Sequence, residues 1–422
     1  MTDLFPFQEE GVKFLVSRRR ALLLDEPGLG KTLQAIRAND MLEHDGMNVI
    51  CPASVRTQWR HAYANDSINR RDFASYSYEE ARSRGVQARS CLVLDEQHFL
   101  KNAASKRTRK ILGTRCYGRD GLVADALYVW GLTGTPMPKD ASDLYAPLFA
   151  LVPGALGVNG KTMSYWQYVK HFCKTRPGSG FGGSLQIYGS KNLEELKDRI
   201  APYCLRRTKA EVFPQWSKPV IAELWLEAGD AMRGLDESPE GRMMRAAFIS
   251  GGIDALSVLS DSIATVRRYM GLAIVGALAE WLLEADLKKV VVVCFHREVI
   301  AKLKDELTQA QMETIIYQGG MNDEAKSHIK QTFITQENVR VLLLQIGAGG
   351  TGLDGLQSVC CDMVFAEYSW IDDENKQAIG RIDRIGQKNP VLVRFAGIDG
   401  SLHGDIMQAA RRRAADNKTL FN

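Results

Sequence analysis

Several absences narrow the class of protein to which this sequence of 422 residues belongs. No apolar run approaches the roughly 20 residues that a membrane span needs, and no charged-then-apolar leader opens the chain. The eight cysteines form no C-x-x-C pair, and no His/Cys spacing suggests zinc. The net charge of +4 permits nucleic-acid binding without arguing for it. We therefore expect a soluble, intracellular, cytoplasmic protein without a membrane partner.

The overall composition is that of an ordinary globular protein, with 45% hydrophobic and 25% charged residues. The length allows two or three domains. Several cysteines lie in apolar stretches, so we interpret them as buried free thiols. We interpret the adjacent Cys360 and Cys361 as part of a strand rather than as a redox pair. Basic runs at 18–20 and 411–413 could meet phosphates, although most such runs are solvated surface.

Short apolar runs that alternate with helical patterns predict an α/β protein with parallel sheets. We expect one α/β lobe over residues 1–160, helical insertions and a linker over 161–275, and a second α/β lobe over 276–422. The middle part contains a glycine-rich segment at 177–189. Strands are expected at 21–24, 48–52, 91–94, 127–132, 290–295, 341–344 and 363–365, and helices at 32–44, at 193–200 and through much of 229–270.

A glycine-rich loop lies between the first predicted strand and the first predicted helix, and it contains Gly28, Leu29, Gly30, Lys31 and Thr32. Glycines let backbone N–H groups approach phosphates, and the helix that follows presents its positive end to them. In such loops the lysine reaches the β- and γ-phosphates of a nucleotide, and the threonine binds Mg²⁺. The strict pattern is not met, because an aspartate occupies the first glycine position. The alternative is an ordinary glycine-rich turn.

Two further groups of residues would complete a site for phosphate hydrolysis. Asp95 and Glu96 follow a predicted buried strand, where Asp95 could hold Mg²⁺ through water and Glu96 could deprotonate an attacking water. Arg381 and Arg384 are three residues apart, on one face of a predicted helix, and could stabilise a γ-phosphoryl group. The alternatives are a polar strand end that faces solvent and surface salt bridges.

These motifs together resemble the Swi/Snf family of superfamily-two helicase-like ATPases, and the resemblance runs nearly end to end. It implies two RecA-like lobes with parallel sheets flanked by helices, joined by helical insertions. The run Phe295-His296-Arg297-Glu298 is most similar to the annealing-helicase and fork-remodelling subgroup. The motifs that carry the resemblance are Phe7-Gln8 with Gly11-Val12, Asp25 to Thr32, Cys51-Pro52 with Gln58-Trp59, Asp95 to His98 with Lys101-Asn102, Leu132 to Pro136, Leu205 to Lys209, Gln318 to Gly320, Gly349 to Leu353, and Gln377 to Gln387.

The resemblance also implies roles for individual residues. ATP and Mg²⁺ are the expected cofactors, with Gln8 reading adenine and Gln377 adding to the nucleotide contacts. Trp59 and Trp370 are expected to pack in the core rather than to stack on bases. Pro27 stands where the family usually has methionine. The chain also departs from the family pattern at Gln97, Gly347, Asp354 and Glu367, which bears on DNA affinity and interlobe coupling. The expected DNA contacts, made mostly to phosphates, are Arg56, Thr135, His296, Gly349, Gly350 and Thr351.

The resemblance implies a monomeric DNA-dependent ATPase that moves along duplex or forked DNA without reading its sequence. Two alternatives stay open: an unwinding helicase that acts on RNA or single strands, and a non-enzymatic, nucleotide-gated clamp or scaffold. An intact set of Lys31, Glu96, Arg381 and Arg384 argues against a scaffold. The sequence resembles no chromatin-reading module, which favours a bacterial or viral source over a chromatin remodeller. It identifies no protein partner.

Overall fold

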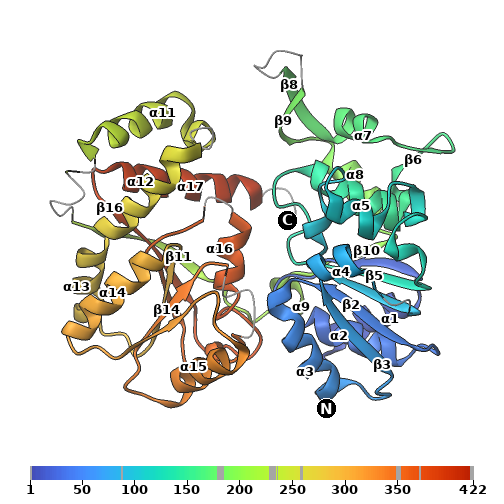
Figure 1. Cartoon of the computed structure of the whole chain (residues 1–422), viewed down its shortest axis with the longest axis horizontal. Helices are drawn as coiled ribbons and strands as arrows, with labels where there is room; N and C mark the ends of the chain where they lie inside the picture. The colour runs from blue at the N-terminus through green and yellow to red at the C-terminus, as the bar shows by residue number, and fades with distance from the viewer. Residues whose placement is uncertain are drawn as a thin grey trace. The chain divides into compact units, whose positions relative to one another are not determined.

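In the computed structural model the chain forms two compact units, Met1–Trp216 and Ser217–Asn422, which are called unit 1 and unit 2 below (Figure 1). The structure describes residues 2–86, 89–177, 185–227, 234, 236–256, 260–347, 353–369 and 372–418. In that part of the chain, no helix combines the length and the apolar character needed to cross a membrane.

Unit 1 is built on a parallel sheet of six strands within its described residues, in the order β10-β1-β5-β4-β2-β3. Most of these strands are apolar runs without polar alternation, as expected for parallel strands that are covered on both faces. The strands are β1 (Arg20–Leu23), β2 (Gly46–Cys51), β3 (Asp72–Ser77), β4 (Cys91–Asp95), β5 (Tyr128–Leu132) and β10 (Cys204–Leu205).

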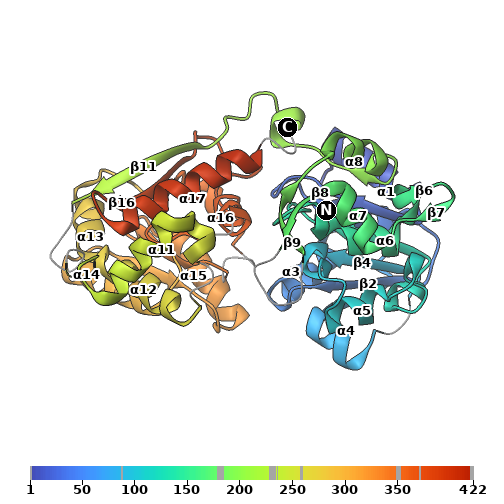
Figure 2. The same ribbon diagram turned by 90° about the horizontal axis from the view of Figure 1, so that it is seen from above.

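Helices cover both faces of this sheet (Figure 2). One face packs against α1, α2 and α3, where Ile36 and Trp59 are buried, and the other packs against α4, α5 and α6, where Tyr78 and Leu148 are buried. The helices of unit 1 are α1 (Pro6–Val16), α2 (Lys31–Asp40), α3 (Arg56–Asp66), α4 (Tyr78–Arg84), α5 (Lys106–Leu112), α6 (Tyr145–Leu151), α7 (Tyr165–Phe172), α8 (Leu193–Ile200) and α9 (Lys209–Val212).

The segment that we expected to be helical, 161–275, is only partly so. It contains the antiparallel hairpin of β8 (Cys173–Pro177) and β9 (Leu185–Ser190), and it supplies β10 to unit 1 and β11 (Val220–Leu226) to unit 2. The prediction was wrong for these strands because β10 and β11 are defined by pairing with β1 and β16, which are distant in sequence. The domain boundaries derived from the sequence stay a prediction.

Unit 2 contains a second parallel sheet, in which the described strands follow the order β11-β16-β15-β12-β14-β13. Its inner strands are buried nearly throughout and share one core with the surrounding helices. The strands other than β11 are β12 (Val290–Cys294), β13 (Thr314–Tyr317), β14 (Val341–Gln345), β15 (Asp362–Phe365) and β16 (Leu392–Ile398).

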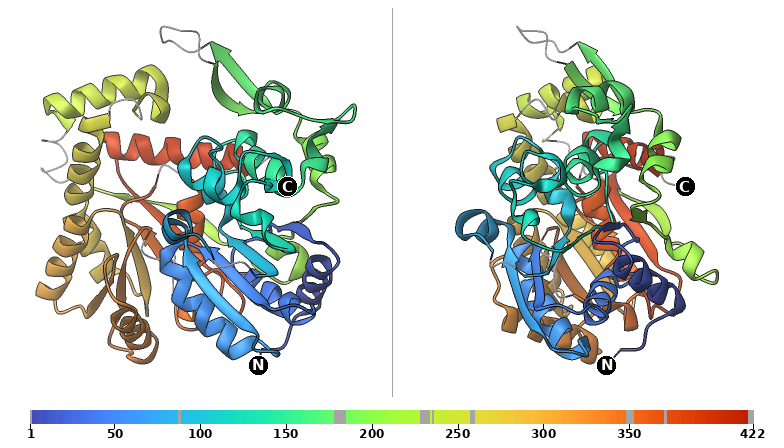
Figure 3. Two further views of the ribbon diagram at one scale, coloured as in Figure 1. Left: turned by 45° about the vertical axis from the view of Figure 1, so that its right-hand side comes forward. Right: turned by 90° about the vertical axis from the view of Figure 1, so that its right-hand side faces the viewer.

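The helices of unit 2 surround this sheet, and α11 packs along α17 (Figure 3). Two parallel sheets flanked by helices confirm the predicted fold class of two RecA-like lobes. The helices are α11 (Pro239–Leu256), α12 (Ser260–Ala273), α13 (Val275–Glu284), α14 (Arg297–Gln309), α15 (Asp323–Thr335), α16 (Asp372–Ile379) and α17 (Leu402–Lys418).

The sheet order of unit 1 brings the predicted site residues together. Strands β1, β5 and β4 are neighbours, so the segments that follow Leu23, Leu132 and Asp95 leave the same edge of the sheet. The carboxyl ends of parallel strands are where α/β proteins place their ligands. All eight cysteines are free, and five of them are buried, so the interpretation as buried free thiols is confirmed for those five. The strand prediction for Cys360 and Cys361 was wrong, because β15 begins only at Asp362.

Candidate functional site

The loop after β1 has the backbone geometry of a phosphate-binding loop. Gly28 and Gly30 have positive φ angles of 90° and 74°, which only glycine adopts readily. Gly30 is also the residue before α2, so the loop ends at the N-terminus of a helix of 10 residues. A Cβ atom on Gly30 would lie 2.4 Å from Gln8 Nε2, so a side chain there would displace the Gln8 amide.

Lys31, the first residue of α2, is close enough to Asp95, the last residue of β4, and to Glu96 after it for their charges to act on its ammonium group. Its ammonium group donates to the carbonyl oxygens of Asp25 at 2.6 Å and Glu26 at 3.3 Å. Desolvation lowers the pKa of Lys31, and the charges of Glu96, Asp25 and Asp95 oppose that shift. The structure therefore gathers the predicted lysine and the predicted carboxylates at one place.

Asp95 is held by hydrogen bonds on both sides of its carboxylate. Trp59 Nε1 donates to Asp95 Oδ2 at 2.7 Å, and the N–H of Glu96 donates to Oδ1 at 3.0 Å. The hydroxyl of Tyr78 donates to the Asp95 carbonyl at 2.7 Å. Burial, followed by the charge of Glu96, raises the pKa of Asp95. Trp59 is buried as predicted, and its indole N–H also orients this carboxylate.

Glu96 occupies an unusual backbone conformation, with φ 51° and ψ 51°. A non-glycine residue in this left-handed region costs roughly 1–2 kcal/mol, so the surrounding contacts must hold it there. Its Oε2 accepts from Thr133 Oγ1 at 3.2 Å and lies 3.3 Å from His98 Nδ1. Burial raises the pKa of Glu96, but the bond with His98 and the charges of His98 and Lys31 outweigh it, so the pKa is lowered overall. A base that stays ionised suits proton abstraction from water.

A buried ion pair fixes the start of the phosphate loop. The Asp25 carboxylate is 0% exposed and accepts from the Arg207 guanidinium at 2.6 Å and 3.1 Å and from the Arg207 backbone N–H at 3.0 Å. The carbonyl of Arg207 in turn accepts from the N–H of Glu26 at 3.0 Å. Arg207 belongs to a motif that was recognised in the sequence, but no role was derived for it, because 182 residues separate it from Asp25.

Two glutamines join the same network. Gln34 Nε2 donates to Asp25 Oδ2 at 3.1 Å and to the Leu29 carbonyl at 3.2 Å. Gln8 Nε2 also donates to the Leu29 carbonyl at 3.2 Å, while its Oε1 accepts from the N–H of Phe5 at 3.0 Å. Gln8 therefore connects α1 with the phosphate loop, and its predicted contact with adenine stays a prediction.

The residues at this edge suit a magnesium–nucleotide complex. Oxygen donors are the ligands that Mg²⁺ prefers, and the ion usually keeps several waters. Thr32, next to Lys31 at the start of α2, and Asp95, at the end of β4, are such donors. The oriented carboxylate of Asp95 is the observation that supports a metal site here, and Lys31 supplies the positive charge for the phosphates.

In unit 2, Gln377 lies on α16, but the two predicted arginines follow that helix instead of belonging to it. The helix ends at Ile379, and Arg381 and Arg384 lie in turns beyond it, so the helical prediction was wrong there. Within these turns Gly386 adopts a φ of 94°, and the side-chain amide of Gln387 donates to the carbonyls of Ile382 and Cys360. The guanidinium of Arg384 forms an ion pair with Asp354.

The residues predicted to contact DNA have varied environments. Arg56 donates to Glu80 at 2.8 Å, and Thr135 is 6% exposed, with its hydroxyl 3.4 Å from His98 Nδ1. His296 Nδ1 lies 2.6 Å from Glu367 Oε1. Each of these side chains is thus engaged inside its unit, and their contact with DNA stays a prediction. Gly349, Gly350, Thr351 and Trp370 lie outside the described residues.

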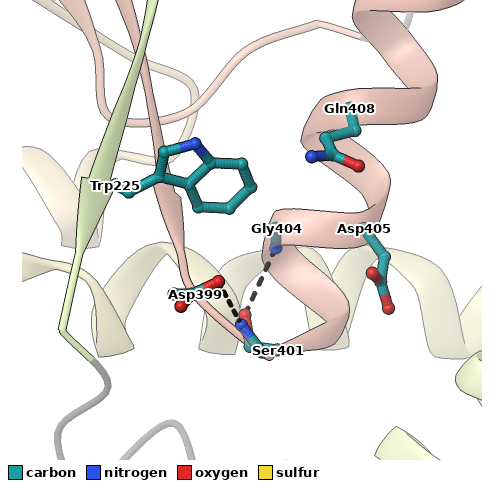
Figure 4. A pocket seen from close by; sticks show the side chains of 7 residues that line it. Trp225, Asp399, Ser401, Gly404, Asp405 and Gln408 are labelled. Carbon is teal, nitrogen blue, oxygen red and sulfur yellow. Dashed lines mark hydrogen bonds between the residues drawn. The ribbon is translucent and has the colours of Figure 1, made fainter.

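A separate cavity of about 570 Å³ in unit 2 opens beside Trp225, after the end of β16 (Figure 4). Asp399, Ser401 and Asp405 are among the residues that line it. The carboxylate of Asp399 accepts from the N–H of Gly400 at 3.0 Å, and that of Asp405 pairs with Arg245 at 3.4 Å. Both carboxylates are therefore engaged in contacts within unit 2, and we assign no ligand to this cavity.

The fold and the loop together define a phosphate-loop α/β protein. Comparison with protein families places it more narrowly: the model of the SNF2-related domain matches residues 7–87 and 75–227, and that of the helicase conserved C-terminal domain matches residues 273–386. The first model covers more than half of the chain, so the chain belongs to the SNF2-related family, which confirms the predicted resemblance.

Similar proteins include two curated relatives and a solved structure. The mouse DNA annealing helicase and endonuclease ZRANB3 is 26% identical over 100% of this chain and 41% of its own length. The Drosophila melanogaster SWI/SNF-related matrix-associated actin-dependent regulator of chromatin subfamily A-like protein 1 is 26% identical over 93% of this chain and 52% of its own. The chain thus spans about half or less of these relatives. The Sulfolobus solfataricus SWI2/SNF2 ATPase core in complex with dsDNA is 20% identical, covers 100% of this chain and 93% of its own, and has a TM-score of 0.40.

Proposed function

We propose that this chain is the ATPase core of a DNA translocase, which hydrolyses ATP to ADP and phosphate in order to move along duplex or forked DNA. The observation that carries the proposal is the convergence of Lys31, Asp95 and Glu96 at the carboxyl edge of one sheet. Membership of the SNF2-related family supports it, as does the similarity to a relative that is named a DNA annealing helicase.

The proposed chemistry uses the residues of unit 1. The phosphate loop and Lys31 bind the β- and γ-phosphates, and Thr32 and Asp95 hold Mg²⁺ through its waters. The bound ion would neutralise charge on the phosphate oxygens. Glu96 takes a proton from a water molecule while the oxygen of that water attacks the γ-phosphorus. The bond between the γ-phosphorus and the bridging oxygen then breaks, and that oxygen leaves as part of ADP.

The proposed role of unit 2 is to supply Arg381 and Arg384 to the same nucleotide, with Gln377 as a further contact. A well-placed arginine raises phosphoryl-transfer rates by roughly 10³–10⁵. The ion pair between Arg384 and Asp354 bears on this role, because a carboxylate that binds the guanidinium competes with phosphate for it. The sequence marked Asp354 as a departure from the family's usual asparagine.

Replacing Asp354 by asparagine should therefore strengthen the enzyme. The side chain of Asp354 is 40% exposed, and an exposed ion pair contributes roughly 0–1 kcal/mol. We expect D354N to raise kcat/KM for ATP by up to about fivefold. Steady-state kinetics in the wild-type and R384A backgrounds check this, because the gain should vanish without Arg384. An equal gain in both backgrounds would mean that Asp354 acts through another group.

A comparison of ATP hydrolysis with duplex DNA, forked DNA, single-stranded DNA and RNA tests the proposed function. We expect hydrolysis to rise most with duplex or forked DNA and to fall as salt increases, because phosphate contacts release counterions. The K31A variant, which lacks the lysine of the phosphate loop, is the background control. Stronger stimulation by RNA or single strands would favour the unwinding helicase. Absence of hydrolysis with every polynucleotide would favour the nucleotide-gated scaffold.

A further inference from the structure

Another cavity, of about 640 Å³, lies in unit 1, and the residues that line it suit a polyanionic ligand. It opens where α4 and α5 lie side by side (Figure 2), next to the turn Gln97–Leu100. Among the described residues that line it, none is acidic. Its lining includes His98, Phe99 and four cationic side chains, Arg82, Lys101, Lys106 and Arg107.

The positive charge of this cavity is only partly compensated. Arg107 forms an ion pair with Glu79, and the ammonium group of Lys101 lies 3.8 Å from the carboxylate of Asp143. Arg82 and Lys106 are exposed, and neither forms an ion pair with a described residue. An anionic ligand would therefore gain two charge-assisted contacts without breaking an existing pair.

An exposed aromatic ring accompanies these charges. Phe99 is 42% exposed and stacks on the buried Tyr78, with ring centroids 5.5 Å apart and planes 6° apart. The guanidinium of Arg107 lies 5.7 Å from the centroid of each ring. Cations beside an exposed ring suit a nucleotide strand, whose phosphates meet the charges while an unpaired base stacks on the ring. An acidic peptide would satisfy the charges but not the ring.

The cavity is also connected to the residues of hydrolysis. His98 lines it, and His98 Nδ1 lies 2.9 Å from Thr133 Oγ1 and 3.3 Å from Glu96 Oε2. One side chain therefore separates a ligand in the cavity from the carboxylate that is proposed to act as the base. A strand bound here would be able to alter the position of Glu96 through that imidazole.

We infer that this cavity binds an unpaired nucleic-acid strand, with Arg82 and Lys106 on its phosphates and Phe99 against a base. The inference rests on the proposed function and adds a strand-binding site to it. Lys101 and Arg107 contribute charge, and His98 couples occupancy to hydrolysis. On a forked substrate the site selects the single-stranded arm, which a duplex does not offer.

The experiment measures binding of labelled single-stranded, forked and duplex oligonucleotides by fluorescence anisotropy over a range of salt. The double variant R82A/K106A removes the two unpaired cations, and R109A/K110A is a matched control that removes two exposed charges of α5 outside the cavity. We expect R82A/K106A to weaken single-strand binding and to reduce the salt slope by about 1.4, at about 0.7 for each lost contact. F99A should weaken single-strand binding about 5- to 150-fold and spare the duplex.

Hydrolysis supplies the second measurement. Both double variants should hydrolyse ATP at the wild-type basal rate, and only R82A/K106A should need more single-stranded or forked DNA for half-maximal stimulation. Unchanged affinity and salt slope in R82A/K106A would overturn the inference. Binding of labelled poly-glutamate, a model acidic peptide, is measured in the same way, and a variant R82A/K106A that loses poly-glutamate binding but keeps single-strand binding would also overturn it. If no nucleic acid stimulates ATP hydrolysis by the wild type, the proposed function fails. A loss of single-strand binding in R82A/K106A but not in R109A/K110A would still support strand binding in the cavity.

Discussion

The variant E96Q should bind ATP normally and hydrolyse it about 10²- to 10⁴-fold more slowly than the wild type, the range that a positioned general base contributes. Glutamine keeps the size of the side chain and an oxygen that can accept from Thr133, but it cannot take a proton from water. The measurement is kcat with saturating duplex DNA, together with the affinity for a fluorescent ATP analogue.

The geometry explains why this substitution should act on chemistry and not on folding. The strained backbone of Glu96 is held by the ends of β4 and β5, and Thr133 and His98 contact its carboxylate. E9Q is a suitable control, because Glu9 is exposed on α1. A rate for E96Q within tenfold of the wild type would remove Glu96 from the role of base. A loss of ATP binding would instead give the residue a structural role in the site.

The strands that were predicted from the sequence are the ones buried on both faces. Strands β2, β4 and β12 are apolar runs in which nearly every residue is buried, so composition alone identifies them. The missed strand β3 has an exposed and half-buried edge pattern, and β10 has only two residues. Their conformation follows from pairing with a neighbour, which a single sequence does not reveal.

Strand β16 was missed for a different reason. It lies between β11 and β15, but Arg394 interrupts its apolar run. In the structure this guanidinium donates to Asp362 on β15 at 2.8 Å, so the charge is paired across neighbouring strands. A pattern search that expects uninterrupted apolar residues in a central strand fails at such a position.

The candidate site was predictable where its chemistry is local in sequence. The loop from Gly28 to Thr32 and the pair Asp95 and Glu96 are contiguous motifs, and their residue types suffice to suggest phosphate and metal binding. The residues that orient them were not predictable. Trp59 contacts Asp95 across 36 residues, and Arg207 contacts Asp25 across 182. Only the folded sheet shows those pairs.

The second large effect is expected at that buried pair: R207A should destabilise unit 1 by about 3–5 kcal/mol, the cost of leaving a buried charge without its partner. The Asp25 side chain is 0% exposed, and the Arg207 side chain is 10% exposed. Because whole domains are stable by only about 5–15 kcal/mol, this loss is a large fraction of the total. Thermal unfolding followed by calorimetry should show that the midpoint temperature of the unit 1 transition falls, while that of the unit 2 transition stays unchanged.

A matched control separates this pair from an ordinary surface one. Arg199 and Glu195 form a half-exposed pair in the same unit at 2.8 Å, which should contribute only about 0–1 kcal/mol. R199A should therefore leave the transition of unit 1 nearly unchanged. The double variant D25N/R207M removes both charges and should recover much of the stability that R207A loses, because no uncompensated charge remains. Equal shifts in R207A and R199A would show that the Asp25 carboxylate finds other stabilisation. A shift in R207A that D25N/R207M fails to reduce would assign the loss to the contacts of Arg207 with Phe7 and Gln34 instead.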